Sequence, residues 1–283
     1  MSDLRTLLSV VIPSRNGSSL LREYLPAVLE DARGAEIIVV DDCSEEDLAG
    51  LVAMEFPGVR LIGREPPRGF CFAVNEGVEA SNSPFVMVLN NDVAPEPGCF
   101  AELVSRLESA PAEVFCVVPR IIRPDGSDES RVTVRFRRGL AVSSIDHRGV
   151  PYPSGACSLY RREKWGTLGG YSRAYAPIYW EDADLGMRAR RAGMRMERVE
   201  SAVVRHHHAA TMGMTSEALT LRERNRIIFT RIHFARPMQR LLHRLWIPLH
   251  ILSSLVRGRP EFLRGFLEAR AVRFDLHGSC VIL

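Results

Sequence analysis

The sequence lacks the long hydrophobic run that a membrane-spanning helix requires. Of its 283 residues, the longest nearly apolar segment is 245–256, which contains Pro248 and His250. A spanning helix needs roughly 20 predominantly apolar residues. The first residues also lack a basic lead into an apolar stretch and a small-residue cleavage site, so no secretory signal peptide is expected. We therefore expect a cytoplasmic protein.

Cysteine and glycine patterns that mark other protein classes are missing as well. The six cysteines are scattered without CxxC or Cys/His spacing, so we expect neither a disulfide framework nor a zinc site. The polar segment 13–17, after the first apolar run, lacks the GxGxxG fingerprint of a nicotinamide-dependent oxidoreductase. It also lacks the glycine-rich loop that a nucleotidyltransferase making sugar nucleotides would carry there.

Charge is distributed unevenly along a chain of ordinary globular composition. Residues 1–221 hold 25 Lys and Arg against 30 Asp and Glu, whereas residues 222–283 hold 12 against 4. A uniformly basic domain would have indicated nucleic-acid binding, and we expect no nucleic-acid partner. An acidic body with a basic, apolar-rich tail indicates an anionic surface that only one end contacts.

Apolar runs alternate with segments of helical periodicity through the first half of the chain. The runs at 7–13, 36–40, 59–62, 85–89 and 114–119 predict strands, and 19–31, 48–56 and 70–80 predict helices. Fully apolar strands separated by amphipathic helices indicate an α/β fold with a mostly parallel sheet, covered by helices on both faces.

The second half is less regular. Residues 123–148 predict an irregular or hairpin insertion, followed by a short strand that ends at Tyr160. Helices are predicted at 164–171 and 181–192, and a strand at 194–204. From Ser216 onward the pattern is helical and basic, with expected breaks at Pro237, Pro248 and Pro260.

Polar clusters follow three of the predicted strands. They are Pro13 to Asn16, Asp41 with Asp42, and Asn90 to Asp92. Ligands of such sheets bind beyond the carboxyl ends of the strands, so we expect the clusters to meet at one edge. One of the two adjacent aspartates is expected to cap a helix. The other could accept a hydrogen bond from a nucleobase imide or a ribose hydroxyl.

Asp92 is the first candidate for metal binding. It precedes Pro95 and Pro97 in a loop that these prolines stiffen, and Mg²⁺ or Mn²⁺ prefers carboxylate oxygens. The alternative is an Asx turn. The run His206 to His208 does not have the spacing of a zinc site, and a single histidine that completes coordination begun by Asp92 is the simpler reading.

The segment 180–184 carries three carboxylates at the start of a predicted helix. Asp184 and Arg188 are spaced as a structural i,i+4 pair. Glu181 and Asp182 remain as candidates for a general base, which must lie within hydrogen-bond reach of the proton that it removes. Trp180 could stack on a sugar ring or be buried.

Together these segments resemble the inverting glycosyltransferases of family 2, which have the GT-A fold, over about residues 7–230. The matching segments are SVVIPSRNG (9–17), EIIVVDDCS (36–44), RGFCFAVNEG (68–77), FVMVLNNDVAPEPG (85–98), PSGACSLYRRE (153–163), GGYSRAYAPIYWEDADLGMRARRAG (169–193) and VVRHHHAAT (203–211). The later segments are most similar to rhamnosyltransferase-like and related polysaccharide-building members.

The resemblance implies roles for individual residues. It implies a nucleotide pocket lined by Pro13, Ser14, Asn16, Asp41, Asp42, Arg68, Asn75 and Asn91. Asp42, with Asp41 as second choice, would accept from the base, Arg68 would lie near the diphosphate, and Asn75 would help to shape the site. A divalent metal, Mg²⁺ or Mn²⁺, would bind Asp92 and His206. Asp182, with Glu181 beside it, would be the catalytic base, and Gly155, Ala156 and Trp180 would face the acceptor.

The implied activity is metal-assisted, inverting transfer of a sugar from a UDP- or dTDP-linked donor to a hydroxyl of a glycan or lipid-linked acceptor in cell-surface polysaccharide synthesis. The implied organisation is a GT-A domain at 1–215, divided into a nucleotide-sugar half (1–119) and an acceptor and catalytic half (120–215). A basic amphipathic helical extension follows at 216–283. Asn90 and Asn91 leave one carboxylate in the metal motif. A catalytically silent partner of the same fold, or a membrane-associated binding protein, is therefore the alternative.

The basic extension interleaves arginines with apolar residues. Basic amphipathic helices of this kind can lie in an anionic membrane interface, so residues 222–273 predict peripheral attachment to the inner face of the cell membrane. The alternative is that they pack against the catalytic domain, or against a second subunit in a homo-oligomer.

Overall fold

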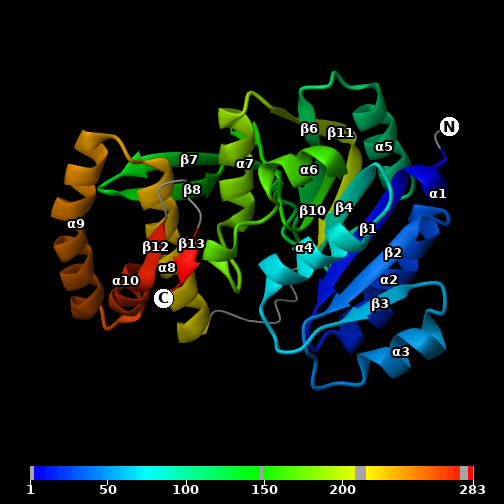
Figure 1. Ribbon diagram of the computed structural model, residues 1–283, viewed down its shortest axis with the longest axis horizontal. Coiled ribbons are helices and arrows are strands. Elements are labelled where there is room, and N and C mark those ends of the chain that lie inside the picture. Colours follow the sequence, from blue (N-terminus) through cyan, green and yellow to red (C-terminus); the bar gives the residue numbers. More distant parts are fainter. Residues whose placement is uncertain (1–2, 147–148, 208–214, 275–279, 283) are drawn as a thin grey trace.

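The alternating strands and helices of the sequence build a central sheet with helices on both faces in the computed structural model (Figure 1). The structure describes residues 3–146, 149–207, 215–274 and 280–282. The strands of the large sheet are β1 (Leu8–Ser14), β2 (Glu36–Asp41), β3 (Arg60–Gly63), β4 (Phe85–Leu89), β5 (Val93–Pro95), β6 (Val114–Ile122), β10 (Cys157–Arg161) and β11 (Arg195–His206). Their order is β3-β2-β1-β4-β10-β6-β11-β5.

The sheet is parallel in the half that the first strands form and mixed in the other. β1 pairs in parallel with β2 and β4, and β2 with β3. β10 runs antiparallel to both β4 and β6, β6 and β11 are parallel, and β5 is antiparallel to β11. The predicted α/β class is confirmed, but the central sheet, expected to be mostly parallel, is mixed because β10 and β5 run antiparallel to their neighbours.

Helices cover the sheet and form the end of the molecule that lies farthest from β3. They are α1 (Leu4–Leu7), α2 (Ser18–Ala32), α3 (Leu48–Glu55), α4 (Phe70–Ala80), α5 (Cys99–Ser109), α6 (Arg162–Leu168), α7 (Glu181–Arg191), α8 (Ser216–His233), α9 (Pro237–Val256) and α10 (Glu261–Ala271), with the short 3-10 helix η1 (Arg173–Tyr175). Figure 1 shows α9 and α10 at one end, with α8 between them and the large sheet. No described helix is long and apolar enough to span a bilayer.

Two smaller sheets complete the fold. β7 (Arg131–Arg137) and β8 (Leu140–Ile145) form an antiparallel hairpin, to which β9 (Val150–Pro151) adds a short third strand. The hairpin alternative for 123–148 is therefore the correct one. β12 (Val272–Phe274) pairs with β13 (Cys280–Ile282).

Successive residues of each buried strand face two different cores. Val10 and Ile12 belong to the core shared with α2, α3 and α5, whereas Val11 packs on the other side with α4 and α7. Gly77 lets α4 approach β1 closely, because a Cβ at this position would collide with Val11 and lie 3.0 Å from Val40 Cγ2.

Three local expectations are corrected. Neither Asp41 nor Asp42 caps α3, because Asp47 does so and its Oδ1 accepts from the Gly50 amide at 2.8 Å. Pro248 does not end a helix but lies inside α9. Proline has no N–H to donate to the carbonyl one helical turn earlier, and because Pro248 is exposed this carbonyl can bond to water instead. The elements α5 and β5 were not expected, and β5, with three residues, is defined by its pairing with β11.

Candidate active site

The ends of β1, β2 and β4 bring their polar clusters together, as predicted. Ser14 Oγ, at the end of β1, accepts a hydrogen bond from Asn91 Nδ2 at 3.1 Å, which joins β1 to the loop after β4. The Asp42 amide donates to the Ser14 carbonyl at 2.9 Å, which joins β1 to the loop after β2. Pro13 is buried immediately before this edge.

The loops after β1 and β2 hold each other in place. The Asn16 amide donates to Ser44 Oγ at 2.8 Å, and Asn16 Oδ1 accepts from the Glu45 amide at 2.8 Å. Asp41 Oδ1 in turn accepts from the Ser44 amide at 2.9 Å. Asn16 is exposed and Asp41 is partly exposed, so both can still be reached by a ligand.

Asp42 is buried, and its carboxylate orders the loop before α4. Oδ1 accepts from the Arg68 amide at 2.9 Å and Oδ2 from the Gly69 amide at 2.7 Å. The Arg68 side chain is exposed, with its guanidinium 5.6 Å from the centre of the Phe72 ring. Asp42 thus fixes the backbone position of Arg68. Each of its carboxylate oxygens keeps a lone pair that can accept a further hydrogen bond.

Asn75 shapes the site from α4 by holding a neighbouring segment. Its Nδ2 donates to the Tyr171 carbonyl at 2.8 Å, and its Oδ1 accepts from the Tyr171 amide at 2.9 Å. Both functions of the amide are therefore used on one backbone residue. A role in shaping the site fits this arrangement better than direct contact with a nucleotide.

Asp92 and His206 converge at the paired ends of β5 and β11. His206 is aligned with Val93 in that pairing, and its Nε2 lies 3.4 Å from Asp92 Oδ1. On the other side of the ring, Nδ1 lies 2.6 Å from Glu129 Oε1, and Arg123 contacts the same carboxylate at 2.7 Å. His208 lies outside the described residues.

His206 lies between two carboxylates, those of Asp92 and Glu129. Burial opposes the charged form of His206, but hydrogen bonds to Asp92 and Glu129 raise its pKa to about 9. A carboxylate on Nδ1 orients the ring so that Nε2 faces Asp92, which is the usual outer-shell arrangement of a metal-binding histidine. Within the described residues no group of three or more His, Cys, Asp or Glu side chains could hold a metal ion.

Glu181 and Asp182 differ in their environments although they are adjacent. Glu181 is buried, and burial together with the neighbouring Asp182 charge raises its pKa well above the usual range. Asp182 is partly buried, and burial raises its pKa to about 6 even though the Ala183 and Gly155 amides bond to its carboxylate. Asp182 can thus be ionised near neutral pH, whereas burial favours the protonated form of Glu181.

The segment 155–156 connects Asp182 to the edge of the sheet. The Gly155 amide bonds to the Asp182 carboxylate, and the Ala156 carbonyl accepts from the Asn90 amide at 2.9 Å. Asn90 is two residues before Asp92. The candidate base and the candidate metal ligand are therefore positioned by one short path of backbone hydrogen bonds.

The turn before α7 has unfavourable backbone dihedral angles, which contacts with surrounding residues stabilise. Tyr179 and Trp180 both have positive φ, 83° and 75°, which costs a non-glycine residue about 1–3 kcal/mol. Asn225 of α8, which is fully buried, lies 2.8 Å from the Ile178 carbonyl and 3.0 Å from the Tyr179 carbonyl through its Nδ2. The Trp180 ring packs on Phe229 at 4.8 Å between centres. One face of Trp180 is thus occupied by the protein.

Asp184 anchors α7 through a buried network. It pairs with Arg188 at 2.7 Å, as its spacing predicted, and with His233 Nε2 of α8 at 2.8 Å. Burial would raise the pKa of Asp184, but the His233 hydrogen bond and the Arg188 charge lower it. Because α8 supplies both Asn225 and His233, this helix belongs physically to the catalytic surroundings.

Comparison with known proteins identifies the family. The sequence model of glycosyl transferase family 2 matches residues 9–168, which is more than half of the chain. The chain belongs to glycosyl transferase family 2. This glycosyltransferase is 27% identical over 241 residues to the N-acetylglucosaminyl-diphospho-decaprenol L-rhamnosyltransferase of Mycobacterium tuberculosis, covering 73% of this chain and 78% of the relative. The expected rhamnosyltransferase-like resemblance is confirmed at this modest identity.

Two solved structures show the same fold. GalNAc-T7 with UDP, GalNAc and Mn²⁺ aligns with a TM-score of 0.64 at 18% identity, over 82% of this chain and 48% of that one. The mannosyltransferase PcManGT from Pyrobaculum calidifontis, in complex with GDP-Man and Mn²⁺, aligns with a TM-score of 0.59 at 16% identity, over 94% and 87%. This glycosyltransferase therefore has the GT-A fold, and it spans about half the length of GalNAc-T7.

Three residues near the site were not expected from the sequence. Glu129 belongs to the irregular region before β7, and Asn225 and His233 lie in the helix that was assigned to the basic extension. No short motif marks any of them. The one signal that the sequence offers for Asn225 is its place as a polar residue two positions before the apolar run that begins at Ile227.

Proposed function

We propose that this glycosyltransferase inverts the anomeric centre while it moves a sugar from a UDP- or dTDP-linked donor to a hydroxyl of a glycan or lipid-linked acceptor, in cell-surface polysaccharide synthesis. The observation that carries the proposal is Asp182, a partly buried carboxylate with a pKa of about 6 at the start of α7. A general base works best when its pKa lies near the operating pH. The activity for which the mycobacterial relative is named supports a lipid diphosphate acceptor and an L-rhamnosyl donor.

The reaction is a single displacement. Asp182 removes the proton from the acceptor hydroxyl as its oxygen forms a bond to the anomeric carbon, and the bond from that carbon to the diphosphate oxygen breaks. Glu181, whose protonated form is favoured by burial, is less suited to this role. Ser14, Asn16, Asp41, Asp42, Arg68 and Asn91 would surround the nucleotide at the sheet edge. Gly155, Ala156 and the open face of Trp180 would meet the acceptor.

A divalent cation, Mg²⁺ or Mn²⁺, fits between Asp92 and His206. When bound, it would neutralise charge that builds on the departing nucleoside diphosphate. The Mn²⁺ in both aligned structures supports this cofactor. Because the chain offers a pair of ligands, we expect the donor diphosphate to complete the coordination, so that metal and nucleotide bind together.

Thermal unfolding with UDP, dTDP, GDP and CMP, each with Mn²⁺ or with EDTA, tests the donor and the metal. A ligand at 100 times its dissociation constant adds about 2.7 kcal/mol to the free energy of unfolding. We expect one nucleotide to stabilise the protein with Mn²⁺ and to lose most of this effect with EDTA. Asp92→Asn should lose the Mn²⁺-dependent part, whereas the exposed Asp125→Asn should keep it. No response to any nucleotide would contradict the proposed donor site.

The proposal includes peripheral attachment to the inner face of the cell membrane through residues 222–273. The support is the excess of arginine in this stretch and the apolar side chains that α9 exposes. Co-sedimentation with vesicles that contain an anionic phospholipid tests the attachment. A protein that stays in the supernatant with neutral and anionic vesicles alike would contradict it.

A further inference from the structure

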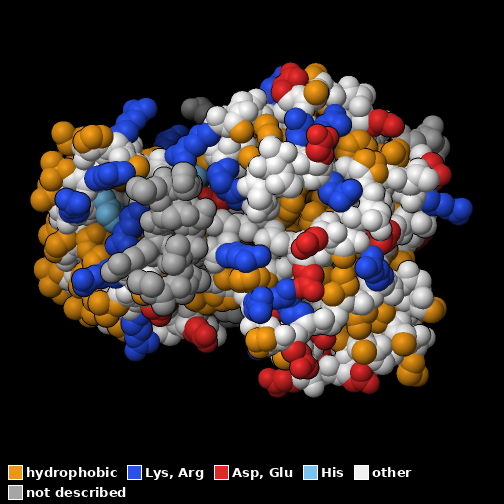
Figure 2. All heavy atoms as spheres, in the orientation of Figure 1, with side chains coloured by type: hydrophobic (Ala, Val, Ile, Leu, Met, Phe, Trp, Pro, Cys, Tyr) orange, Lys and Arg blue, Asp and Glu red, His pale blue; other side chains and the backbone are white. Residues whose placement is uncertain are grey.

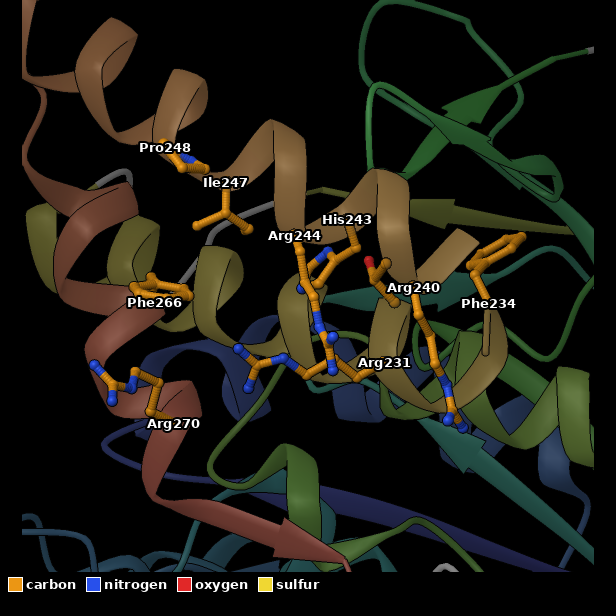
Figure 3. Close-up of a pocket in the computed structure, with 10 residues that line it drawn as sticks. Arg231, Phe234, Arg240, His243, Arg244, Ile247, Pro248, Phe266 and Arg270 are labelled. Atoms are coloured by element: carbon orange, nitrogen blue, oxygen red, sulfur yellow. The ribbon is translucent and has the colours of Figure 1, made fainter. Parts of the chain in front are cut away.

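A pocket of about 610 Å³ lies between α8, α9 and α10, away from the catalytic edge. Four arginines line it, Arg231 from α8, Arg240 and Arg244 from α9, and Arg270 from α10. Figure 3 shows Arg240 and Arg244 extending from α9 toward α8, and Arg231 extending from α8 toward α10. Apolar side chains, among them Phe266, form the rest of the wall.

Within the part of the chain that the structure describes, no carboxylate pairs with the positive charge of this pocket. Among the described residues, none of the four guanidinium groups forms an ion pair, and Arg231 instead donates to the Ala269 carbonyl at 2.8 Å. Burial and the charge of Arg270 lower the pKa of Arg231. Arginines that converge without carboxylates favour an anion, and a guanidinium fork matches phosphate oxygens in particular.

His243 adds a further polar atom to the wall. Its Nδ1 lies 2.7 Å from the Gly139 carbonyl oxygen and therefore carries the hydrogen. Its Nε2 is buried and has no hydrogen-bond partner among the described residues. A buried polar atom without a partner is costly, and a ligand hydroxyl that donates to this nitrogen would relieve the cost, whereas phosphate oxygens, which only accept, would be bound by the arginines.

The same helix exposes an apolar stripe on its other side. Residues spaced by three or four along α9 are each at least half exposed: Met238, Leu241, Leu245, Leu249, Leu252 and Val256. The α9 segment contains no Asp or Glu. Figure 2 shows hydrophobic side chains along the rim that α9 forms, with arginines beside them. Anionic headgroups above acyl chains complement this combination of charge and apolar surface.

We propose that the arginine pocket, defined as Arg231, Arg240, Arg244 and Arg270, binds the phosphate of an anionic phospholipid while the α9 stripe enters the acyl boundary. This rests on the proposed membrane attachment and assigns it a specific site. With its 20 residues lying flat, α9 would contact the bilayer over about 30 Å. The phosphate would sit beside the helix, between α9 and the two helices behind it.

Vesicle partition with a matched pair of double variants tests the pocket. Arg240→Gln with Arg244→Gln removes two charges inside it, and Arg257→Gln with Arg259→Gln removes two exposed charges just after α9, outside it. One arginine near an anionic bilayer is worth about fivefold in partition. With phosphatidylglycerol vesicles, we expect the pocket pair to bind at least tenfold more weakly than the control pair. Equal losses of vesicle binding in the two double variants would overturn the pocket, because general electrostatic attraction would then account for the binding.

Soluble ligands separate a lipid from a free anion. Titration with dihexanoyl phosphatidylglycerol below its micelle concentration should show binding at least tenfold tighter than inorganic phosphate, and the pocket pair should abolish it. Equal affinity for both ligands would overturn the lipid assignment. Leu245→Gln with Leu249→Gln should weaken binding to vesicles but not to the short-chain lipid. If this stripe pair instead converts a dimer to a monomer, and the wild type ignores vesicles, the stripe is a subunit interface and the proposal fails.

The nucleotide response distinguishes this inference from the proposed transferase chemistry. The pocket pair should keep the wild-type thermal shift with nucleotide and Mn²⁺, which also shows that it folds. Pocket-dependent vesicle binding without any nucleotide response would contradict the donor proposal alone. A normal nucleotide response without vesicle binding would contradict the pocket alone.

Discussion

The pH dependence of sugar transfer tests the role of Asp182 most directly. Burial raises its pKa to about 6, so the carboxylate that must accept the proton is lost as the pH falls below that value. At pH 5 about one site in ten remains ionised, and kcat/KM should be about one tenth of its value at pH 8. The slope below pH 6 should approach tenfold per unit.

Asp182→Asn removes the base without changing the shape of the side chain. Loss of a general base lowers the rate by about 10²- to 10⁴-fold, and the residual activity should no longer show the inflection near pH 6. Glu181→Gln is the matched control, since burial favours the protonated form of Glu181 and an amide resembles a protonated acid. We expect this variant to keep its activity within a few fold of the wild type.

The Asp182→Asn substitution should also raise the free energy of unfolding. A carboxyl whose pKa is raised on folding disfavours the folded state at every pH above that pKa, and this penalty disappears below the unfolded value of 3.8. At pH 7 the Asp182→Asn protein should therefore gain about 3 kcal/mol in free energy of unfolding, measured with urea. A variant that stays within tenfold of wild-type activity, or keeps the low-pH decline, would refute the assignment of Asp182 as base.

Three further predictions concern the metal pair, the packing and the buried network. His206→Ala should weaken Mn²⁺-dependent nucleotide binding about 10-fold or more in calorimetric titrations, with little change when EDTA is present. Gly77→Ala should lower the free energy of unfolding by about 1–3 kcal/mol through its collision with β1, whereas Gly166→Ala, which has open space in α6, should be neutral or slightly stabilising. Asp184→Ala should cost about 3 kcal/mol, because it leaves the partly buried Arg188 guanidinium and the buried His233 ring without their partner. Arg22→Ala at an exposed pair should change little in the same urea experiment.

The residues that sequence analysis located best are those that follow a buried strand. Ser14, Asp42 and Asn91 meet because parallel strands end at a common edge, and this follows from the apolar runs before them. What these groups bind could not be predicted. Asp42 was expected to serve a helix cap or a nucleobase, yet both its oxygens accept amides from the loop before α4. Loop conformation decides such partners, and no periodicity encodes it.

Residues that act across long sequence separations were beyond prediction. Glu129 reaches His206 across 77 positions, and Asn225 reaches the carbonyls before α7 across more than 40. Both contacts depend on how the hairpin and α8 are placed against the sheet. By contrast, α5 has a clear amphipathic pattern after Gly98 and could have been recognised.

The support that Asn225 gives to the turn at Tyr179 sets the minimal length of a working enzyme. A protein shortened at residue 215 would keep the complete nucleotide edge, yet Trp180 would lose Phe229 and Asp184 would lose His233. Such a truncation should still bind nucleotide and fail to transfer. The basic extension therefore cannot be exchanged as a module from its first residue, and any chimera that exchanges α9 and α10 between relatives should join them after His233.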